Sequence, residues 1–293
     1  MKMPSFEYAA PTTLVDAVAL LAKHSGEAKI IAGGQSLLPI MAFRLASPAV
    51  LVDIAGIPDL RAIRIENDGL HLGPLVRWCE IERSGDIANH HPLLKEAVSH
   101  IAHYQVRNRG TIGGSLAHAD PAGELPCIAV TCSATLSLFS GSGVRKVKAE
   151  DFILGELETN LRTDEIIVDV HFPRWPETRR WAFKEFARRR GDFALGGVAV
   201  YLDLDPTGTV TDCAIGIMGA SARALRLTEI ENMLVGSRIE PKVIERAAMT
   251  ARSTADPSAD IHASREYRKA LIGTLVERAL NAALSASNGA NMQ

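Results

Sequence analysis

The chain has 293 residues, 47% of them hydrophobic and 23% charged, which is enough for two or three compact units. Its net charge of −2 and its aromatic content of 5% argue against nucleic acid or an anionic membrane as the main partner. No stretch approaches the about 20 apolar residues of a membrane span, and the first residues lack a signal peptide's apolar run, so we expect a cytoplasmic protein without a membrane span. The four cysteines form no Cys-x-x-Cys pair, so the sequence offers no zinc or iron–sulfur framework.

Residues 1–58 predict a small α/β unit in which helices and strands alternate. Thr13 precedes Asp16 at the spacing of a helix N-cap, and the apolar residues that follow repeat at helical spacing. Gly26 ends this helix, because glycine readily adopts the left-handed conformation found beyond helix C-termini. The other predicted elements are a strand over 29–32, a helix over 37–46 and a strand over 50–54.

Residues 59–175 predict a second unit that mixes strands and helices. Asn67-Asp68-Gly69 separates two short alternating runs and predicts a hairpin turn. The stretch 105–123 is polar and contains glycines, and it is too long to be an incidental connection. The predicted elements are strands over 61–65, 70–72, 134–139 and 165–172, and helices over 79–84, 92–102 and 124–132.

Residues 176–285 predict an α+β domain, because the strands come first and the helices follow. Short turns between the strands favour an antiparallel sheet, which the helices then cover. We expect the last residues, 286–293, to form a frayed tail. The predicted strands cover 181–187, 196–205 and 210–218, and the predicted helices cover 228–235, 241–252 and 264–285.

Two glycine pairs are candidate ligand-binding segments. Gly33-Gly34 follows a predicted strand and is followed by Ser36, while Gly113-Gly114 lies between Thr111 and Ser115. Glycines permit positive φ angles and a close ligand approach, and successive N–H groups in such turns bind anions. These features favour a diphosphate ligand, with two simple turns as the alternative. No Gly-x-Gly-x-x-Gly is present, so the sequence gives a Rossmann site no support.

Residues 32–39 together with 111–126 closely resemble the two flavin-binding segments of the FAD-binding medium subunit of molybdenum hydroxylases, the carbon monoxide dehydrogenase and xanthine dehydrogenase family. The resemblance runs nearly end to end and includes 6–11, 165–173 and 183–194. It implies the vanillyl-alcohol-oxidase (PCMH) type of FAD-binding fold, an α+β architecture. Two α/β FAD subdomains, 1–58 and 59–175, precede a C-terminal α+β domain of the CO dehydrogenase flavoprotein type, 176–285, and the tail.

The resemblance also implies which residues bind FAD. Glu124 suits ribose hydroxyls, because an ionised carboxylate accepts strong hydrogen bonds and repels phosphate. Lys184 lies close to the polar edge of the flavin in this comparison, where a cation stabilises a reduced flavin, and an ordinary surface strand lysine is the alternative. The implied FAD-binding residues are Ile31, Ala32, Gly33, Gly34, Gln35, Ser36, Leu37, Leu38, Ile101, Thr111, Ile112, Gly113, Gly114, Ser115, Ala119, Glu124, Ile167 and Lys184.

The implied function is that of an oxidoreductase subunit that is inactive on the organic substrate without partners. In the family, a large subunit oxidises substrate at a molybdenum cofactor, and a small subunit carries the electrons through iron–sulfur clusters to FAD. The external acceptor is NAD, a quinone or oxygen. We therefore expect a heterooligomer in which FAD is the only redox group of this chain, with no metal site and no catalytic residue. His118 and Asp120 resemble a catalytic pair, but loop polar residues usually satisfy backbone groups.

Several alternatives stay open at this point. A stand-alone FAD oxidoreductase of the same superfold is one, and a scaffold subunit whose flavin site has decayed is another, although the intact glycine pairs argue against decay. Phe193 either shields one face of the flavin or belongs to the core. The run Arg188–Arg190 is either a solvated face or a docking surface.

Overall fold

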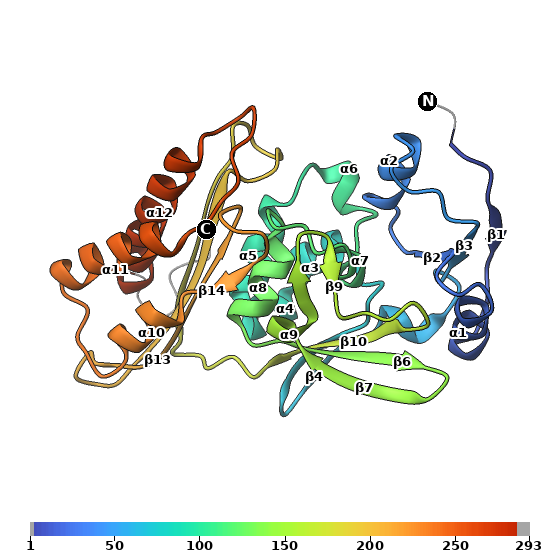
Figure 1. The fold of residues 1–293 in the computed structure, drawn as a ribbon. Coiled ribbons are helices and arrows are strands. Elements are labelled where there is room, and N and C mark those ends of the chain that lie inside the picture. The colour runs from blue at the N-terminus through green and yellow to red at the C-terminus, as the bar shows by residue number, and fades with distance from the viewer. Residues whose placement is uncertain (1–2, 286–293) are drawn as a thin grey trace.

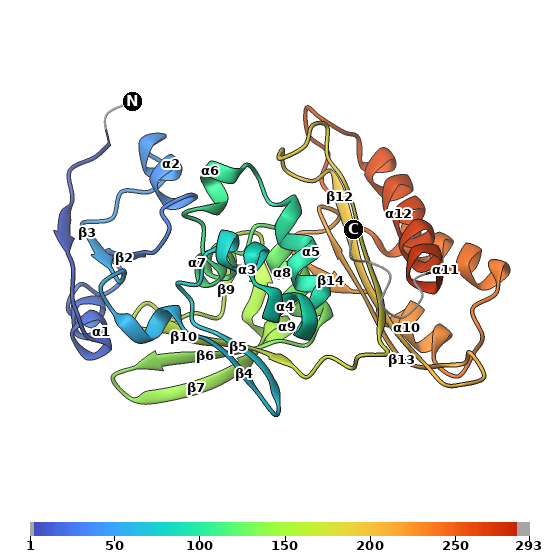
Figure 2. The same cartoon turned by 180° about the vertical axis from the view of Figure 1, so that it is seen from behind.

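The computed structural model describes residues 3–285, so the predicted tail over 286–293 lies outside the described residues. Successive parts of the chain lie next to one another, with the N-terminal unit and the C-terminal sheet at opposite ends of the molecule (Figures 1 and 2). Within the described residues, no helix has both the length and the apolar character that a membrane span requires.

The N-terminal unit is built on a three-stranded parallel sheet in the order β1-β3-β2. Its elements are β1 (Glu7–Ala9), α1 (Leu14–Lys23), β2 (Ala28–Ile31), α2 (Leu37–Ala42) and β3 (Val50–Asp53). The Asp16 N–H donates to Thr13 Oγ1 at 3.1 Å, so Thr13 is the N-cap of α1 as predicted. Ala17, Val18 and Leu21 of α1 are buried against this sheet, which satisfies the apolar stripe seen in the sequence.

The middle of the chain rests on a five-stranded antiparallel sheet in the order β4-β5-β10-β6-β7. Its strands are β4 (Ile63–Glu66), β5 (Gly69–Leu72), β6 (Thr135–Ser140), β7 (Gly143–Lys148) and β10 (Ile166–Pro173), with a small pair β8 (Ile153–Gly155) and β9 (Glu158–Thr159). The helical elements are η1 (Pro58–Arg61), α3 (Trp78–Arg83), α4 (Gly85–His90), α5 (Pro92–His100), α6 (Tyr104–Arg107), α7 (Ile112–His118), α8 (Glu124–Thr131) and α9 (Ala149–Phe152).

The structure corrects two of the sequence expectations and adds elements that were not predicted. The stretch 105–123 is not a continuous loop, because α6 and α7 lie within it. The helix predicted over 37–46 ends at Ala42, since Arg44 has φ +60, which a right-handed helix cannot continue. The segment between β6 and β10 contains β7, α9, β8 and β9, none of which the sequence reading anticipated.

A four-stranded antiparallel sheet in the order β11-β12-β13-β14 forms the C-terminal part, and the predicted order of strands before helices is confirmed. Its elements are β11 (Arg180–Phe186), β12 (Gly196–Leu204), β13 (Val210–Met218), β14 (Leu225–Arg226), α10 (Thr228–Leu234), α11 (Pro241–Thr254) and α12 (Arg265–Ser285). The helices α11 and α12 cover one face, while α5 and α8 from the middle part pack on the other (Figure 1).

Strand β12 contributes to two hydrophobic cores at once. Val198 and Val200 face the C-terminal helices, whereas Ala199 and Tyr201 belong to the core of the middle part. Side chains of a strand alternate between the two faces of a sheet, so a strand that is buried on both faces reads as a continuous apolar run. This shared strand holds the C-terminal sheet against α5 and α8, and so fixes the position of β11 relative to them.

Candidate functional site

The first glycine segment, residues 31–38, is a half-buried turn between β2 and α2. Gly34 has φ +73, a left-handed conformation that favours glycine. Gln35 Nε2 donates to the Gly33 carbonyl oxygen at 3.3 Å, which closes the turn. The backbone N–H groups of residues 33–37 donate to no acceptor in the described part of the chain. A row of free N–H groups in such a turn suits an anion.

The second glycine segment, residues 111–115, is the N-cap and first turn of α7 instead of a loop. The Gly114 N–H donates to Thr111 Oγ1 at 3.1 Å, so Thr111 caps the helix. The N–H groups of residues 112–115 all donate to acceptors within the protein, at 2.9–3.1 Å. This segment therefore offers a ligand the exposed backbone of Gly114 and the hydroxyl of Ser115, but no free row of N–H groups.

Gly33 of the first segment lies against the backbone of Arg109 and Gly110, directly before the second segment. A β-carbon at this position would lie 2.1 Å from the carbonyl oxygen of Arg109, so only glycine lets the two backbones approach so closely. Gly113 is equally constrained, because its β-carbon would lie 2.3 Å from the Pro74 side chain. Gly33 and Gly113 are thus required by packing, and the positive φ that the sequence suggested for the glycine pairs occurs only at Gly34. We call residues 31–38 together with residues 111–115 the cradle.

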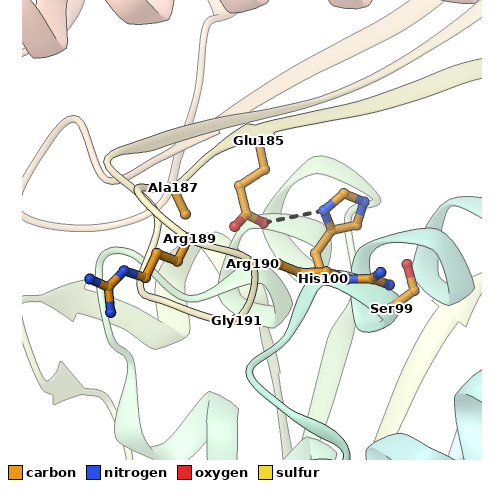
Figure 3. A pocket seen from close by; sticks show the side chains of 7 residues that line it. All are labelled: Ser99, His100, Glu185, Ala187, Arg189, Arg190 and Gly191. Atoms are coloured by element: carbon orange, nitrogen blue, oxygen red, sulfur yellow. Dashed lines mark ion pairs between the residues drawn. The ribbon is translucent and has the colours of Figure 1, made fainter.

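A cavity of about 270 Å³ lies between the end of α5 and the turn that joins β11 to β12. Its walls include His100, Glu185 and the exposed Arg189 and Arg190. Figure 3 shows the Glu185 carboxylate turned toward the His100 imidazole, and Glu185 Oε2 lies 3.9 Å from His100 Nδ1. This oxygen is buried and has no hydrogen-bond partner in the described residues, so the cavity contains an acceptor that a polar ligand group could satisfy.

Two acidic side chains near this cavity hold their protons unusually tightly. Burial raises the pKa of Glu185 to about 7, although His100 opposes the shift. Burial raises the pKa of Glu124, the first residue of α8, to about 8, and the nearby carboxylates of Glu185 and Asp120 add to the rise. Both acids therefore change charge near neutral pH, and Glu185 does so in the wall of the cavity.

The comparisons with known proteins decide the family. A family model described as the FAD binding domain in molybdopterin dehydrogenase matches residues 4–175, and a model described as the CO dehydrogenase flavoprotein C-terminal domain matches residues 181–283. The chain belongs to this FAD-binding family of the molybdenum hydroxylases. Its cofactor is FAD, and the family recognised from the two glycine segments is confirmed.

Individual relatives cover the FAD subunit from end to end. This chain is 41% identical over 284 residues to the 6-hydroxypseudooxynicotine dehydrogenase complex subunit alpha of Paenarthrobacter nicotinovorans, and the alignment covers 97% of this chain and 96% of that one. A carbon monoxide dehydrogenase chain of Hydrogenophaga pseudoflava superimposes with a TM-score of 0.95 at 38% identity, covering 97% and 99% of the two chains. A quinoline 2-oxidoreductase chain of Pseudomonas putida 86 gives 0.92 at 38% identity, covering 98% and 99%. The expected fold class is confirmed.

The cradle of this FAD subunit fits its cofactor. A pyrophosphate needs several hydrogen-bond donors, and the free N–H groups of residues 33–37 provide them without any cationic side chain in the turn. The Ser36 hydroxyl forms no hydrogen bond to the described residues and is a further donor beside them. Glu124 is half-buried and lies near enough to Glu185, a residue of the cavity wall, for the two carboxylates to interact.

The remaining residues that the resemblance implied lie in different surroundings. Ile101 follows α5 and Ile167 lies on β10, and the side chains of both are buried. Ala119 is also buried and ends α7 with φ +51. Lys184 is exposed on β11, next to Glu185 of the cavity. Ile101 directly follows His100 and Lys184 directly precedes Glu185, two residues that line the cavity, and Glu124 lies near enough to Glu185 for the two carboxylates to interact.

The structure also resolves two smaller questions left by the sequence. Phe193 is 76% exposed, so its interpretation as a core residue is wrong. Asp120 Oδ1 accepts the Ala122 N–H at 2.8 Å, which is the backbone role expected in place of catalysis.

His100 and Glu185 were not predicted as site residues. The alternation of side chains along β11 could have indicated Glu185, because it places this acid on the face of the strand opposite the exposed Lys184.

Proposed function

We propose that this FAD subunit receives electrons from the iron–sulfur clusters of a small partner subunit and passes them to NAD, a quinone or oxygen. A large subunit with a molybdenum cofactor would oxidise the organic substrate. Bound FAD supplies the redox chemistry, because it accepts and releases electrons singly or in pairs. The observation that supports this proposal is the row of free N–H groups over 33–37, placed where the two glycine segments meet.

The glycine segments would hold the phosphate end of the cofactor. We assign residues 31–38 to the pyrophosphate, because the free N–H groups of residues 33–37 can donate hydrogen bonds to anionic oxygens without requiring a lysine. Residues 111–115 and Ala119 would contribute hydroxyl and van der Waals contacts, since the N–H groups over 112–115 are already paired. Glu124 would accept hydrogen bonds from hydroxyl groups of the cofactor, which would favour its ionised form.

The flavin end would lie against the middle core and the cavity. Ile101 and Ile167 are buried apolar residues that suit contact with an aromatic ring system. Lys184 is exposed and forms no ion pair in the described residues, so its ammonium group is free to approach a polar edge of the cofactor. A cation at this place stabilises negative charge on a reduced flavin and so raises its tendency to accept electrons.

The first test is the cofactor content and activity of the purified chain. We expect one FAD per chain, either retained or taken up on titration, and no oxidation of organic substrates by the isolated chain. Affinity purification from native cells should recover an iron–sulfur subunit and a molybdenum subunit together with it. Substrate-dependent bleaching of the flavin in the isolated chain would instead support a stand-alone oxidoreductase, and failure to bind FAD would contradict the proposal.

The cradle itself is tested by Gly34→Val, with Gly208→Val as a matched control. Both glycines have positive φ, +73 and +83, so both variants carry similar backbone strain, on the order of 1–2 kcal/mol. Gly208 lies in a turn with open space around it, whereas a β-carbon at Gly34 would also approach Leu38 to 3.0 Å. We expect FAD affinity to fall at least about 10-fold in the first variant only. Equal FAD affinity in the two variants would show that residues 31–38 do not form the cofactor cradle.

A further inference from the structure

A pair of histidines lies on the five-stranded sheet, outside the cradle and the cavity. His71 of β5 and His171 of β10 are direct partners in the antiparallel register, so their side chains point to the same face. Their rings are stacked with centroids 4.4 Å apart and an interplanar angle of 23°. Both rings are largely buried, with 13% and 23% of the side chains exposed. The register of the strands thus presents two imidazoles side by side.

A carboxylate completes the group from the turn between β4 and β5. Asp68 Oδ1 lies 3.2 Å from His71 Nε2, and Asp68 Oδ2 lies 3.7 Å from His171 Nε2. One ligand atom from each of these residues falls within 4.8 Å of the other two. Metal–ligand bonds of about 2.0–2.1 Å in a tetrahedral site separate ligand atoms by about 3.4 Å, so these spacings are close to those of a metal site.

The surrounding residues orient His71 as a ligand. Asp169 Oδ2 lies 2.9 Å from His71 Nδ1, and Arg64 holds the other oxygen of Asp169 at 2.9 Å. An Nδ1–H that donates to Asp169 leaves the lone pair of Nε2 directed at Asp68. With Nε2 unprotonated two acceptors face each other, and either a proton on Nε2 or a metal cation between the two atoms relieves this contact, so a bound metal would replace that proton. A carboxylate behind a ligating histidine is the usual outer partner in zinc sites, because it fixes the tautomer and the ring orientation.

We propose that Asp68, His71 and His171 form a binding site for a divalent transition metal of the Zn²⁺ type. Two imidazoles and one carboxylate suit zinc and its neighbours better than Mg²⁺ or Ca²⁺, which prefer sites made of oxygen ligands. Asp68 is 63% exposed, so water can reach a fourth position. The Asp68 carbonyl oxygen accepts a hydrogen bond from His171 Nε2 at 3.2 Å, so a metal would displace this proton and could take the carbonyl oxygen as a further ligand. The bound metal would tie the turn between β4 and β5 to β10, the central strand of the sheet (Figures 1 and 2).

The experiment uses the full chain, prepared without a histidine tag and stripped with a chelator. Zn²⁺ is titrated by calorimetry, and Co²⁺ is added as a spectroscopic probe whose visible absorption reports low-symmetry nitrogen and oxygen coordination. We expect one Zn²⁺ per chain, and a rise in Tm with saturating Zn²⁺, because the ion binds the folded state selectively. The absence of Zn²⁺ binding at micromolar concentration would overturn the proposal. The absence of a cobalt absorption band would overturn it as well, because it would mean that the three residues are joined by hydrogen bonds and ion pairs alone.

Variants assign the ligands. His171→Gln should lower Zn²⁺ affinity about 100-fold and abolish the cobalt band, and Asp169→Asn, which alters only the outer partner, should lower it about 10-fold. His262→Gln is the control, because this histidine is exposed and lies in the C-terminal part. FAD content and circular dichroism should stay at wild-type values in every variant, which excludes unfolding as the cause. Wild-type Zn²⁺ affinity in His171→Gln would refute the site.

Discussion

The two glycine segments look alike in sequence but do different physical work. Each contains a glycine pair with a serine close behind it. In the first, the N–H groups of residues 33–37 are free and one glycine has positive φ. In the second, the N–H groups of residues 112–115 are paired within the protein, and both glycines lie in a helical turn. We call the first segment the donor surface, because its N–H groups are free to bind a ligand. We call the second segment the wall, because its N–H groups hold the fold together.

This difference teaches that a glycine motif does not reveal how its backbone donors are used. Whether an N–H group is free depends on which carbonyl the fold brings near it, and for α7 these carbonyls come from Pro74 and Val76. The distinction has measurable consequences. Changes in the second segment should act mainly on stability, changes in the first should act mainly on FAD affinity, and a change where the two meet should affect both.

The largest effect is expected where the segments meet, in Gly33→Ala. The new β-carbon would lie 2.1 Å from the Arg109 carbonyl oxygen, which belongs to the backbone and cannot rotate away. We expect the free energy of unfolding to fall by about 3 kcal/mol or more, with loss of FAD uptake, as measured by urea unfolding and cofactor titration. Gly85→Ala is the control, because its β-carbon meets no atom within 4 Å. A stable, FAD-loaded Gly33→Ala protein would contradict the close contact.

The pH dependence of the free energy of unfolding should also distinguish the two segments. Residues 31–38 contain no titratable side chain, whereas the second segment leads into α8, where the pKa of Glu124 is raised to about 8. A raised pKa means that the folded state binds the proton more tightly than the unfolded state, in which the value is about 4.5. The contribution of Glu124 to stability without FAD should therefore be fully present below about pH 4.5 and should be lost as the pH rises to about 8, and Glu185, whose pKa is raised to about 7, contributes with the same sign.

Glu124→Gln should remove the part of this dependence that is due to Glu124 and leave the part that is due to Glu185. We expect the loss of unfolding free energy between pH 5 and pH 8 to shrink by about 2–3 kcal/mol, which is less than the full shift implies because Glu124 is only half-buried. Urea unfolding of the FAD-free chain at the two pH values measures it. Glu156→Gln, at an exposed position, should leave the dependence unchanged. A wild-type slope in Glu124→Gln would mean that Glu124 is already ionised in the folded chain.

The sequence predicted the overall order of elements because most of them carry strong local signals. The apolar runs of β12 and β13, the N-cap Thr13 of α1 and the proline at the start of α11, Pro241, are properties of the segments themselves. Helix α7 was not predicted, because two glycines in its first turn lower helix propensity and because its start depends on carbonyls from a distant segment. Helix α2 was predicted too long because nothing local marks Arg44 as left-handed.

The candidate site was predictable only in part, for the same reason. The resemblance named residues in both glycine segments, and the structure places Gly33 of the first against the backbone directly before the second. It did not reveal that one segment donates and the other supports. The cavity formed by His100 and Glu185 was not foreseen, because its walls come from α5 and β11, which are far apart in the sequence and adjacent only in the folded chain.

A smaller effect on stability is expected from the cap of the second segment. Thr111→Val keeps the shape of the side chain but removes the oxygen that accepts the Gly114 N–H. We expect a loss of about 1 kcal/mol in the free energy of unfolding. Thr13→Val is the matched control, because it removes the same kind of cap from α1, far from the cradle. If the second segment is a wall, Thr111→Val should lower the FAD affinity more than Thr13→Val does at equal stability loss.

The smallest effect on stability belongs to the first segment. Ser36 stands at the start of α2, but its hydroxyl caps nothing and forms no hydrogen bond to the described residues. Ser36→Ala should therefore change the free energy of unfolding by less than about 0.5 kcal/mol. The FAD affinity should still fall about 10-fold, because a hydrogen bond to a charged phosphate contributes about 1.5 kcal/mol. An affinity equal to that of the wild type would show that the hydroxyl faces away from the cofactor, and the donor surface would then consist of backbone N–H groups alone.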